Sequence, residues 1–152
     1  MSSTRVSRHI EASPSRVYAA LIDASDISRW KFPDGMTIDV HEFEGREGGR
    51  FRVSLTYSMP SQMGKTTPHT DTYHGYFKEL VPNKRVVEVI EFETTNPAMR
   101  GEMTTTVELL EIDGATHLTA LHESLSPGVS PVDNETGWRM SLGKLAKLVE
   151  AN

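Results

Sequence analysis

The sequence predicts a single α+β domain in which an antiparallel sheet packs against a long C-terminal helix. From residue 37 to residue 123 the chain is dominated by runs with the two-residue alternation of β-strands, and several connections between them are too short to hold a crossover helix. Ser130-Pro131 then begins a stretch with helical spacing that continues to about Glu150. No internal repeat or domain boundary interrupts the pattern, so we expect residues 1–152 to form one domain.

One strand and two short helices are expected before the main run of strands. Residues 5–11 alternate apolar and polar side chains, as a strand does. Ser13-Pro14 is typical of a helix start, because the serine oxygen can accept a free amide N–H and proline is favoured at the first helical position. We expect this helix to end near Asp23 and a second short helical turn to span residues 25–29.

Six further strands are predicted after the short helices. They span residues 37–44, 50–58, 71–80, 84–93, 102–112 and 115–123. Residues 81–83 and Asp113-Gly114 have turn chemistry, so the strands on either side of each are expected to form antiparallel hairpins. Residues 59–70 are expected to form a long loop. In the C-terminal helix, four apolar side chains spaced four, three and four residues apart are expected to face the sheet: Trp138, Leu142, Leu145 and Val149.

The composition excludes several kinds of site and partner. The chain has no cysteine, so it can have no disulfide framework, thiolate metal site or cysteine nucleophile. The formal charge is −5 and the basic residues are scattered, which argues against nucleic acid or an anionic membrane surface as the main partner. No apolar run approaches the roughly 20 residues of a membrane span, and the first residues lack a signal-peptide pattern. We therefore predict a cytoplasmic protein without a membrane span, a metal or another cofactor.

The order of these elements, together with short markers along the chain, resembles the START-like superfamily, also called SRPBCC. Within it, the chain is most similar to the family named after the activator of the heat-shock-protein-90 ATPase. The markers are Ala12-Ser13-Pro14, Val17-Tyr18, Trp30, Gly48-Gly49-Arg50-Phe51, Gly75, Pro82, Gly114 with Thr116, and Gly137-Trp138. The resemblance implies a helix-grip fold, in which a curved sheet wraps around the last helix and leaves a cavity between them. It also implies that a small hydrophobic or amphipathic molecule binds in this cavity.

The resemblance leaves other functions open, because the superfamily includes lipid carriers, hormone receptors, aromatic cyclases and co-chaperone domains. The eukaryotic activator resembles this chain only in its C-terminal domain, and its N-terminal domain, which contributes to chaperone binding, has no counterpart here. The chain looks more like a stand-alone bacterial protein. The first alternative is a chaperone-associated interaction protein that uses the outer face of the sheet or residues 59–70. The second is a cyclase or hydrolase that uses polar residues of the cavity.

Strand alternation predicts which side chains face the cavity. In residues 50–58, Phe51, Val53 and Leu55 share one face with Tyr57, and the opposite face is polar, so the apolar face must be concave. The predicted cavity residues combine side chains on these apolar strand faces with aromatic and methionine side chains elsewhere and with the apolar stripe of the last helix: Trp30, Met36, Phe51, Val53, Leu55, Tyr73, Phe77, Phe92, Met103, Trp138 and Leu142. Each could instead fill the core, which is the commoner role of a large apolar side chain.

The alternation also places four polar side chains on otherwise apolar faces: Arg8, Glu88, Thr105 and His122. A buried charge is costly unless it is paired, so Arg8 and Glu88 are expected to satisfy each other or to hold a polar group of a ligand. His122 could add a proton donor or acceptor near neutral pH. A β-bulge or a position at a strand end would instead send such a side chain to solvent. We predict no catalytic residues and no metal ligands.

Overall fold

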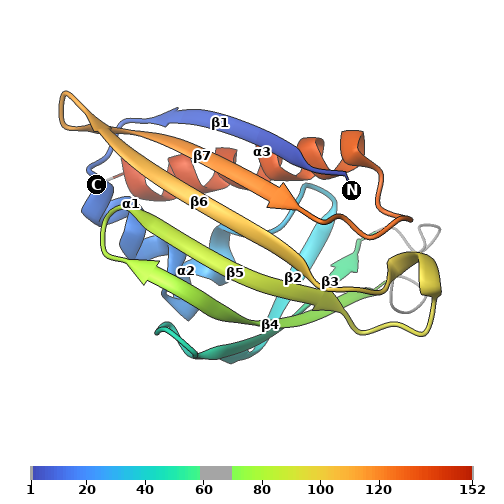
Figure 1. The fold of residues 1–152 in the computed structure, drawn as a ribbon. Helices are drawn as coiled ribbons and strands as arrows, with labels where there is room; N and C mark the ends of the chain where they lie inside the picture. Colours follow the sequence, from blue (N-terminus) through green and yellow to red (C-terminus); the bar gives the residue numbers. More distant parts are fainter. Residues whose placement is uncertain (1, 59–69, 152) are drawn as a thin grey trace.

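A seven-stranded antiparallel sheet curves around three helices in the computed structural model, which describes residues 2–58 and 70–151 (Figure 1). The elements are β1 (Thr4–Ile10), α1 (Pro14–Leu21), α2 (Ala24–Trp30), β2 (Met36–Phe43), β3 (Arg50–Tyr57), β4 (Thr70–Val81), β5 (Arg85–Phe92), the 3-10 turn η1 (Pro97–Met99), β6 (Met103–Ile112), β7 (Ala115–Glu123) and α3 (Pro131–Glu150). The predicted α+β helix-grip architecture is confirmed. The 3-10 turn was not predicted, and the loop predicted over residues 59–70 lies outside the described residues except for Thr70.

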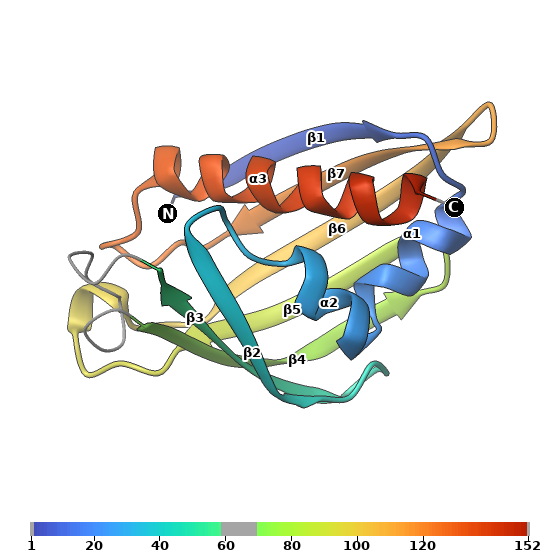
Figure 2. The same ribbon diagram turned by 180° about the vertical axis from the view of Figure 1, so that it is seen from behind.

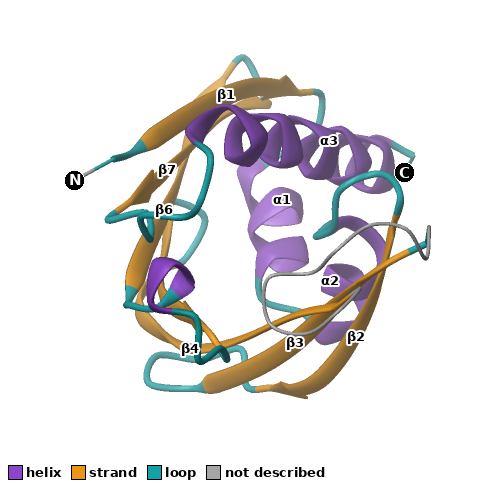
Figure 3. Cartoon of the chain, turned by 90° about the vertical axis from the view of Figure 1, so that its right-hand side faces the viewer, coloured by secondary structure: helices purple, strands orange, loops and turns teal. Residues whose placement is uncertain are grey.

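The sheet has the strand order β1-β7-β6-β5-β4-β3-β2, so the first strand pairs with the last and β2 forms the other edge. Figure 3 shows the strongly curved sheet end-on, and Figure 2 shows the three helices lying across its concave face. Register shifts occur between Val40 and Glu42 and between Phe77 and Glu79, and such bulges increase the bend and twist of a sheet. Gly75 allows a further close approach, because a Cβ there would lie 2.9 Å from the Phe51 ring and even closer to the Val89 carbonyl.

Local sequence signals act as predicted at the helix starts and in one hairpin. The Ser13 hydroxyl accepts a hydrogen bond from the Arg16 amide, and the Ser130 hydroxyl accepts one from the Asp133 amide. Asp113 and Gly114 both have positive φ values, of 50° and 82°, as the tight turn between β6 and β7 requires. These contacts fix where α1 and α3 begin relative to the sheet.

The apolar face of α3 packs on the sheet, as its spacing predicted. Leu142, Leu145 and Val149 are buried in the main core, and Trp138 near the start of the helix is partly buried. Helices α1 and α2 contribute Val17, Leu21, Ile27 and Trp30 to the same core. Of the helices that the structure describes, none is long and apolar enough to cross a membrane.

Candidate functional site

A pocket of about 810 Å³ lies between the sheet and the N-terminal half of α3. Its sheet residues come from the beginnings of β2, β4 and β6 and from the ends of β3, β5 and β7, which meet at one end of the molecule. Figure 3 looks in from this end, with α1 and α2 farther away. The apolar wall includes Met36, Leu55, Phe92, Met99 and Trp138.

Three neighbouring strands carry a row of polar side chains along the wall of this pocket. Glu88 on β5 lies opposite Thr105 on β6, and Thr105 lies opposite His122 on β7. All three are buried among apolar neighbours, and all three line the pocket. With Lys31, which follows the last residue of α2, they form what we call the inner cluster.

Lys31 and Glu88 form a largely buried ion pair within the inner cluster, with side chains that are 18% and 5% exposed. The Lys31 ammonium donates to both carboxylate oxygens, at 2.8 and 3.0 Å, and the Thr105 hydroxyl donates to one of them at 3.3 Å. Burial acts to lower the pKa of Lys31, but the charge of Glu88, helped by Tyr73 and the hydrogen bond, outweighs it and the pKa is raised. Lys31 is therefore charged at neutral pH, and both oxygens of the Glu88 carboxylate are already engaged.

His122 is held from the helix side by α3. Its Nδ1 lies 3.2 Å from the Asn134 Nδ2 amide nitrogen and 3.2 Å from the Trp138 indole Nε1, and the Trp138 ring meets the imidazole edge-on. Burial, with a further contribution from the Lys31 charge, lowers the pKa of His122 to about 4. The ring is therefore neutral at pH 7.

The inner cluster is suited to holding a polar group rather than to transferring protons. Glu88 is neutralised by Lys31, and the Nδ1 lone pair of His122 is shared by two donors, so neither is an available base. Burial raises the pKa of Tyr73, which also lines the pocket and stays neutral at pH 7. In the described part of the chain, no group of three or more His, Asp or Glu side chains could hold a metal ion.

The predicted cavity residues divide between the pocket and the closed core. Those lining the pocket are Met36, Leu55, Tyr73, Phe92, Trp138, Glu88, Thr105 and His122. Those buried away from the pocket are Trp30, Phe51, Val53, Phe77, Met103 and Leu142. Alternation correctly identifies the concave face, but Phe51, Val53 and Phe77 lie farther from the open end, where side chains fill the space.

Arg8 requires a correction. The structure places its side chain in solvent, and the partner of Glu88 is Lys31. Arg8 shares the strand parity of Val6 and Ile10, but β1 is an edge strand, so a long charged side chain can leave the concave side for water.

Sequence reasoning missed Lys31, Asn134 and Asp71, which also line the pocket. Lys31 and Asn134 lie at helix ends, where strand alternation has no meaning. Asp71 had a usable signal, because it shares the parity of Tyr73 on β4 and is indeed buried.

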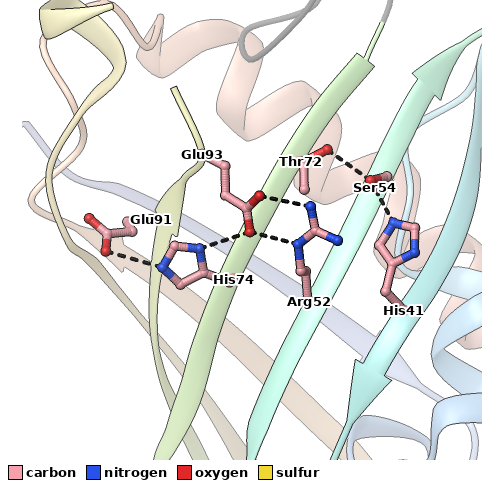
Figure 4. A network of polar contacts seen from close by, with 7 residues as sticks. All are labelled: His41, Arg52, Ser54, Thr72, His74, Glu91 and Glu93. Atoms are coloured by element: carbon pink, nitrogen blue, oxygen red, sulfur yellow. Dashed lines mark hydrogen bonds and ion pairs between the residues drawn. The ribbon is translucent and has the colours of Figure 1, made fainter. Parts of the chain in front are cut away.

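A second polar group of residues, which we call the outer cluster, lies on the opposite face of the sheet (Figure 4). Arg52 on β3 donates to both oxygens of Glu93, at 2.8 and 2.9 Å. His74 on β4 lies 3.0 Å from Glu93 through Nδ1 and 3.2 Å from Glu91 through Nε2. The hydrogen bonds from Arg52, against a smaller opposing effect of burial, lower the pKa of Glu93.

Beside the outer cluster, His41, Ser54 and Thr72 form a hydrogen-bonded chain across β2, β3 and β4, with both distances 2.8 Å (Figure 4). These are ordinary cross-strand polar contacts on the face of the sheet away from the helices.

Comparison with known proteins places this architecture in a family. The family model described as Activator of Hsp90 ATPase homolog 1-like protein matches residues 11–150. The crystal structure of a protein from Chromobacterium violaceum is 28% identical, has a TM-score of 0.87, and aligns over 97% of this chain and 96% of that chain. No curated protein sequence matches the chain.

More distant structures share the fold. The solution structure of a protein from Arthrobacter aurescens is 16% identical with a TM-score of 0.81, over 99% of this chain and 87% of that chain. The solution structure of an AHSA1-like protein from Aeromonas hydrophila is 18% identical with a TM-score of 0.73, over 99% of this chain and 93% of that chain.

Proposed function

Because this chain belongs to the Activator of Hsp90 ATPase homolog 1-like protein family, whose fold wraps a sheet around a long helix, we propose that it binds a small hydrophobic or amphipathic molecule between the two. The observation that carries the proposal is the pocket of about 810 Å³ beside α3. Its volume falls within the range of roughly 300 to 1,000 Å³ that is usual for small-molecule sites.

The chemistry of the pocket wall supports the same proposal. Ligand sites are mostly apolar surfaces with a few polar groups at defined places, and here apolar side chains of four strands and α3 surround one polar row. The methionines Met36, Met99 and Met140 add soft, adaptable surface, which suits a ligand of irregular shape. The apolar wall would supply affinity, and the inner cluster would orient the ligand.

The first prediction tests occupancy with the neutral dye Nile red, whose emission rises in apolar surroundings. We expect saturable binding to the wild-type protein, because the wall can cover the dye from water. Leu55→Trp should weaken the affinity several-fold, since Leu55 lines the pocket and a larger side chain would occupy ligand space. A fluorescence titration of both proteins measures the dissociation constants.

The matched control places the same new side chain outside the pocket. Leu110 on β6 is 61% exposed, so Leu110→Trp should leave dye affinity unchanged. Equal binding by Leu55→Trp and Leu110→Trp would show that the dye binds elsewhere. A wild-type protein that does not change the emission at all would contradict the proposed function.

A further inference from the structure

The hydrogen-bond partners of His122 fix the position of its ring proton. The indole Nε1 of Trp138 can only donate, and it lies 3.2 Å from His122 Nδ1. Nδ1 must therefore be the unprotonated nitrogen that accepts this bond, with the Asn134 amide as a second donor. In a neutral imidazole the other nitrogen then carries the hydrogen, so Nε2 is an N–H donor.

This Nε2–H has no acceptor within the described part of the chain, although it is buried. His122 is 6% exposed, and its Nε2 has no hydrogen-bond partner there. Most buried polar groups are satisfied by protein or water, and leaving a donor unpaired is costly. His122 is also one of the residues that line the pocket, which makes a molecule inside the pocket the candidate for the missing acceptor.

The charges of the pocket indicate that this acceptor is uncharged. Lys31 is the only lysine or arginine among the described residues that line the pocket, and its ammonium already donates to both oxygens of Glu88. Asp133, on the first turn of α3, adds a carboxylate to the same lining. An anionic head group would have to compete with Glu88 for Lys31, whereas a neutral oxygen needs only one donor.

We propose that the pocket selects a neutral molecule with an apolar body and a carbonyl oxygen, and that His122 Nε2–H donates a hydrogen bond to that oxygen. This inference rests on the proposed function and specifies the ligand class. The apolar body would lie against Met36, Leu55 and Phe92, while Thr105 and the Lys31–Glu88 pair form the wall beside the carbonyl end.

The second prediction compares three probes of equal chain length: undecanone, undecane and undecanoate. Each is titrated as a competitor of Nile red at about pH 7, where His122 is neutral. The ketone and the alkane differ in their free energies of transfer from water as well as in hydrogen bonding. A direct comparison of their affinities would therefore not isolate the hydrogen bond. The informative quantity is therefore the ratio of the two dissociation constants, compared between the wild-type protein and variants.

In His122→Phe the affinity for undecanone relative to undecane should fall by about tenfold, because the carbonyl loses its donor. His117→Phe is the matched control. It makes the same substitution on β7 at a residue that does not line the pocket, so its ratio should equal that of the wild-type protein. Undecanoate should bind more weakly than undecanone to the wild-type protein.

Nitrogen NMR of the imidazole gives a second readout that needs no ligand-site variant. We expect the free wild-type protein to show a protonated Nε2 and an unprotonated Nδ1, and undecanone to move the Nε2–H resonance much more than undecane does.

Equal shifts from both probes, or an unchanged ratio in His122→Phe, would overturn this inference and leave the proposed function standing. Undecanoate binding as well as undecanone would overturn the preference for a neutral ligand. Failure of all three probes to displace Nile red would overturn this inference, whereas failure of Nile red itself to bind would overturn the proposed function.

Discussion

The inner and outer clusters contain similar groups in opposite surroundings. Each has a basic side chain that donates to both oxygens of a glutamate, Lys31 to Glu88 inside and Arg52 to Glu93 outside. Glu88 is 4% exposed, whereas the Arg52 side chain is 46% exposed. Water and salt screen an exposed pair but not a buried one, so the same pairing has different energetic consequences on the two faces of one sheet.

The two clusters also differ in how completely their histidines are paired. Both ring nitrogens of His74 contact carboxylates, while His122 uses Nδ1 and leaves Nε2 without a partner among the described residues. At the surface, water can complete any network. In a buried wall, an unpaired donor is costly, and for His122 the adjoining pocket offers space for the molecule proposed above. This comparison favours the inner cluster as the functional one.

The largest expected effect comes from breaking the inner ion pair. Lys31→Met leaves the Glu88 carboxylate buried without its cation, which should lower the free energy of unfolding by about 3 to 5 kcal/mol. Urea denaturation at neutral pH, followed by circular dichroism, measures the loss.

The double variant Lys31→Met with Glu88→Gln is the control for this prediction. It removes both charges together and should recover most of the lost stability, because no isolated charge then remains in the wall. If Lys31→Met alone leaves the urea midpoint unchanged, the pair is not buried in solution and the contrast between the clusters fails.

The next largest effect concerns pH and His122. The pKa is about 4 in the folded protein and near 6.5 in the unfolded chain. Above pH 6.5 the ring is neutral in both states and contributes no pH dependence. As the pH falls from about 6.5 to about 4, the unfolded chain takes up a proton that the folded protein does not, so stability falls by roughly 3 kcal/mol in total.

Denaturation of the wild-type protein and His122→Phe at a series of pH values isolates this contribution. The variant should show a shallower loss of stability between pH 6.5 and 4. Glu93 of the outer cluster should affect stability only in a lower pH range. Its pKa in the folded protein is lowered from 4.5, so its contribution to stability is present above that value and is lost as the pH falls below it. Parallel curves for the two proteins would show that His122 is not buried as a neutral ring.

Strand alternation could predict Glu88, Thr105 and His122 because it depends only on local geometry, and the register shifts in the sheet do not separate these three positions. It could not place Arg8, because alternation does not reveal which strand is an edge. Nor could it separate pocket from core: Leu55 and Val53 share a face, yet only Leu55 reaches the open space.

Lys31 could not be placed from sequence for a different reason. Its position over Glu88 depends on how α2 docks against the sheet, and no periodic signal encodes that. The sequence did contain an indirect signal, since a glutamate on an apolar face requires a cation from elsewhere in the fold. Helix ends are therefore the places to search for the partner of a buried strand charge.

The smallest expected effect comes from the outer cluster. Arg52→Met removes a cation bonded to both oxygens of Glu93, but the pair is exposed and screened. The loss of stability should be a small fraction of that for Lys31→Met and should disappear in about 1 M salt, where the screening length is only about 3 Å. The Lys31→Met loss should largely persist in the same salt, because a largely buried pair is screened much less. Urea midpoints for both variants at low and high salt test the contrast directly. A large Arg52→Met loss that survives high salt would mean that the outer face is as tightly constrained as the pocket wall, and exposure would then not distinguish the two clusters.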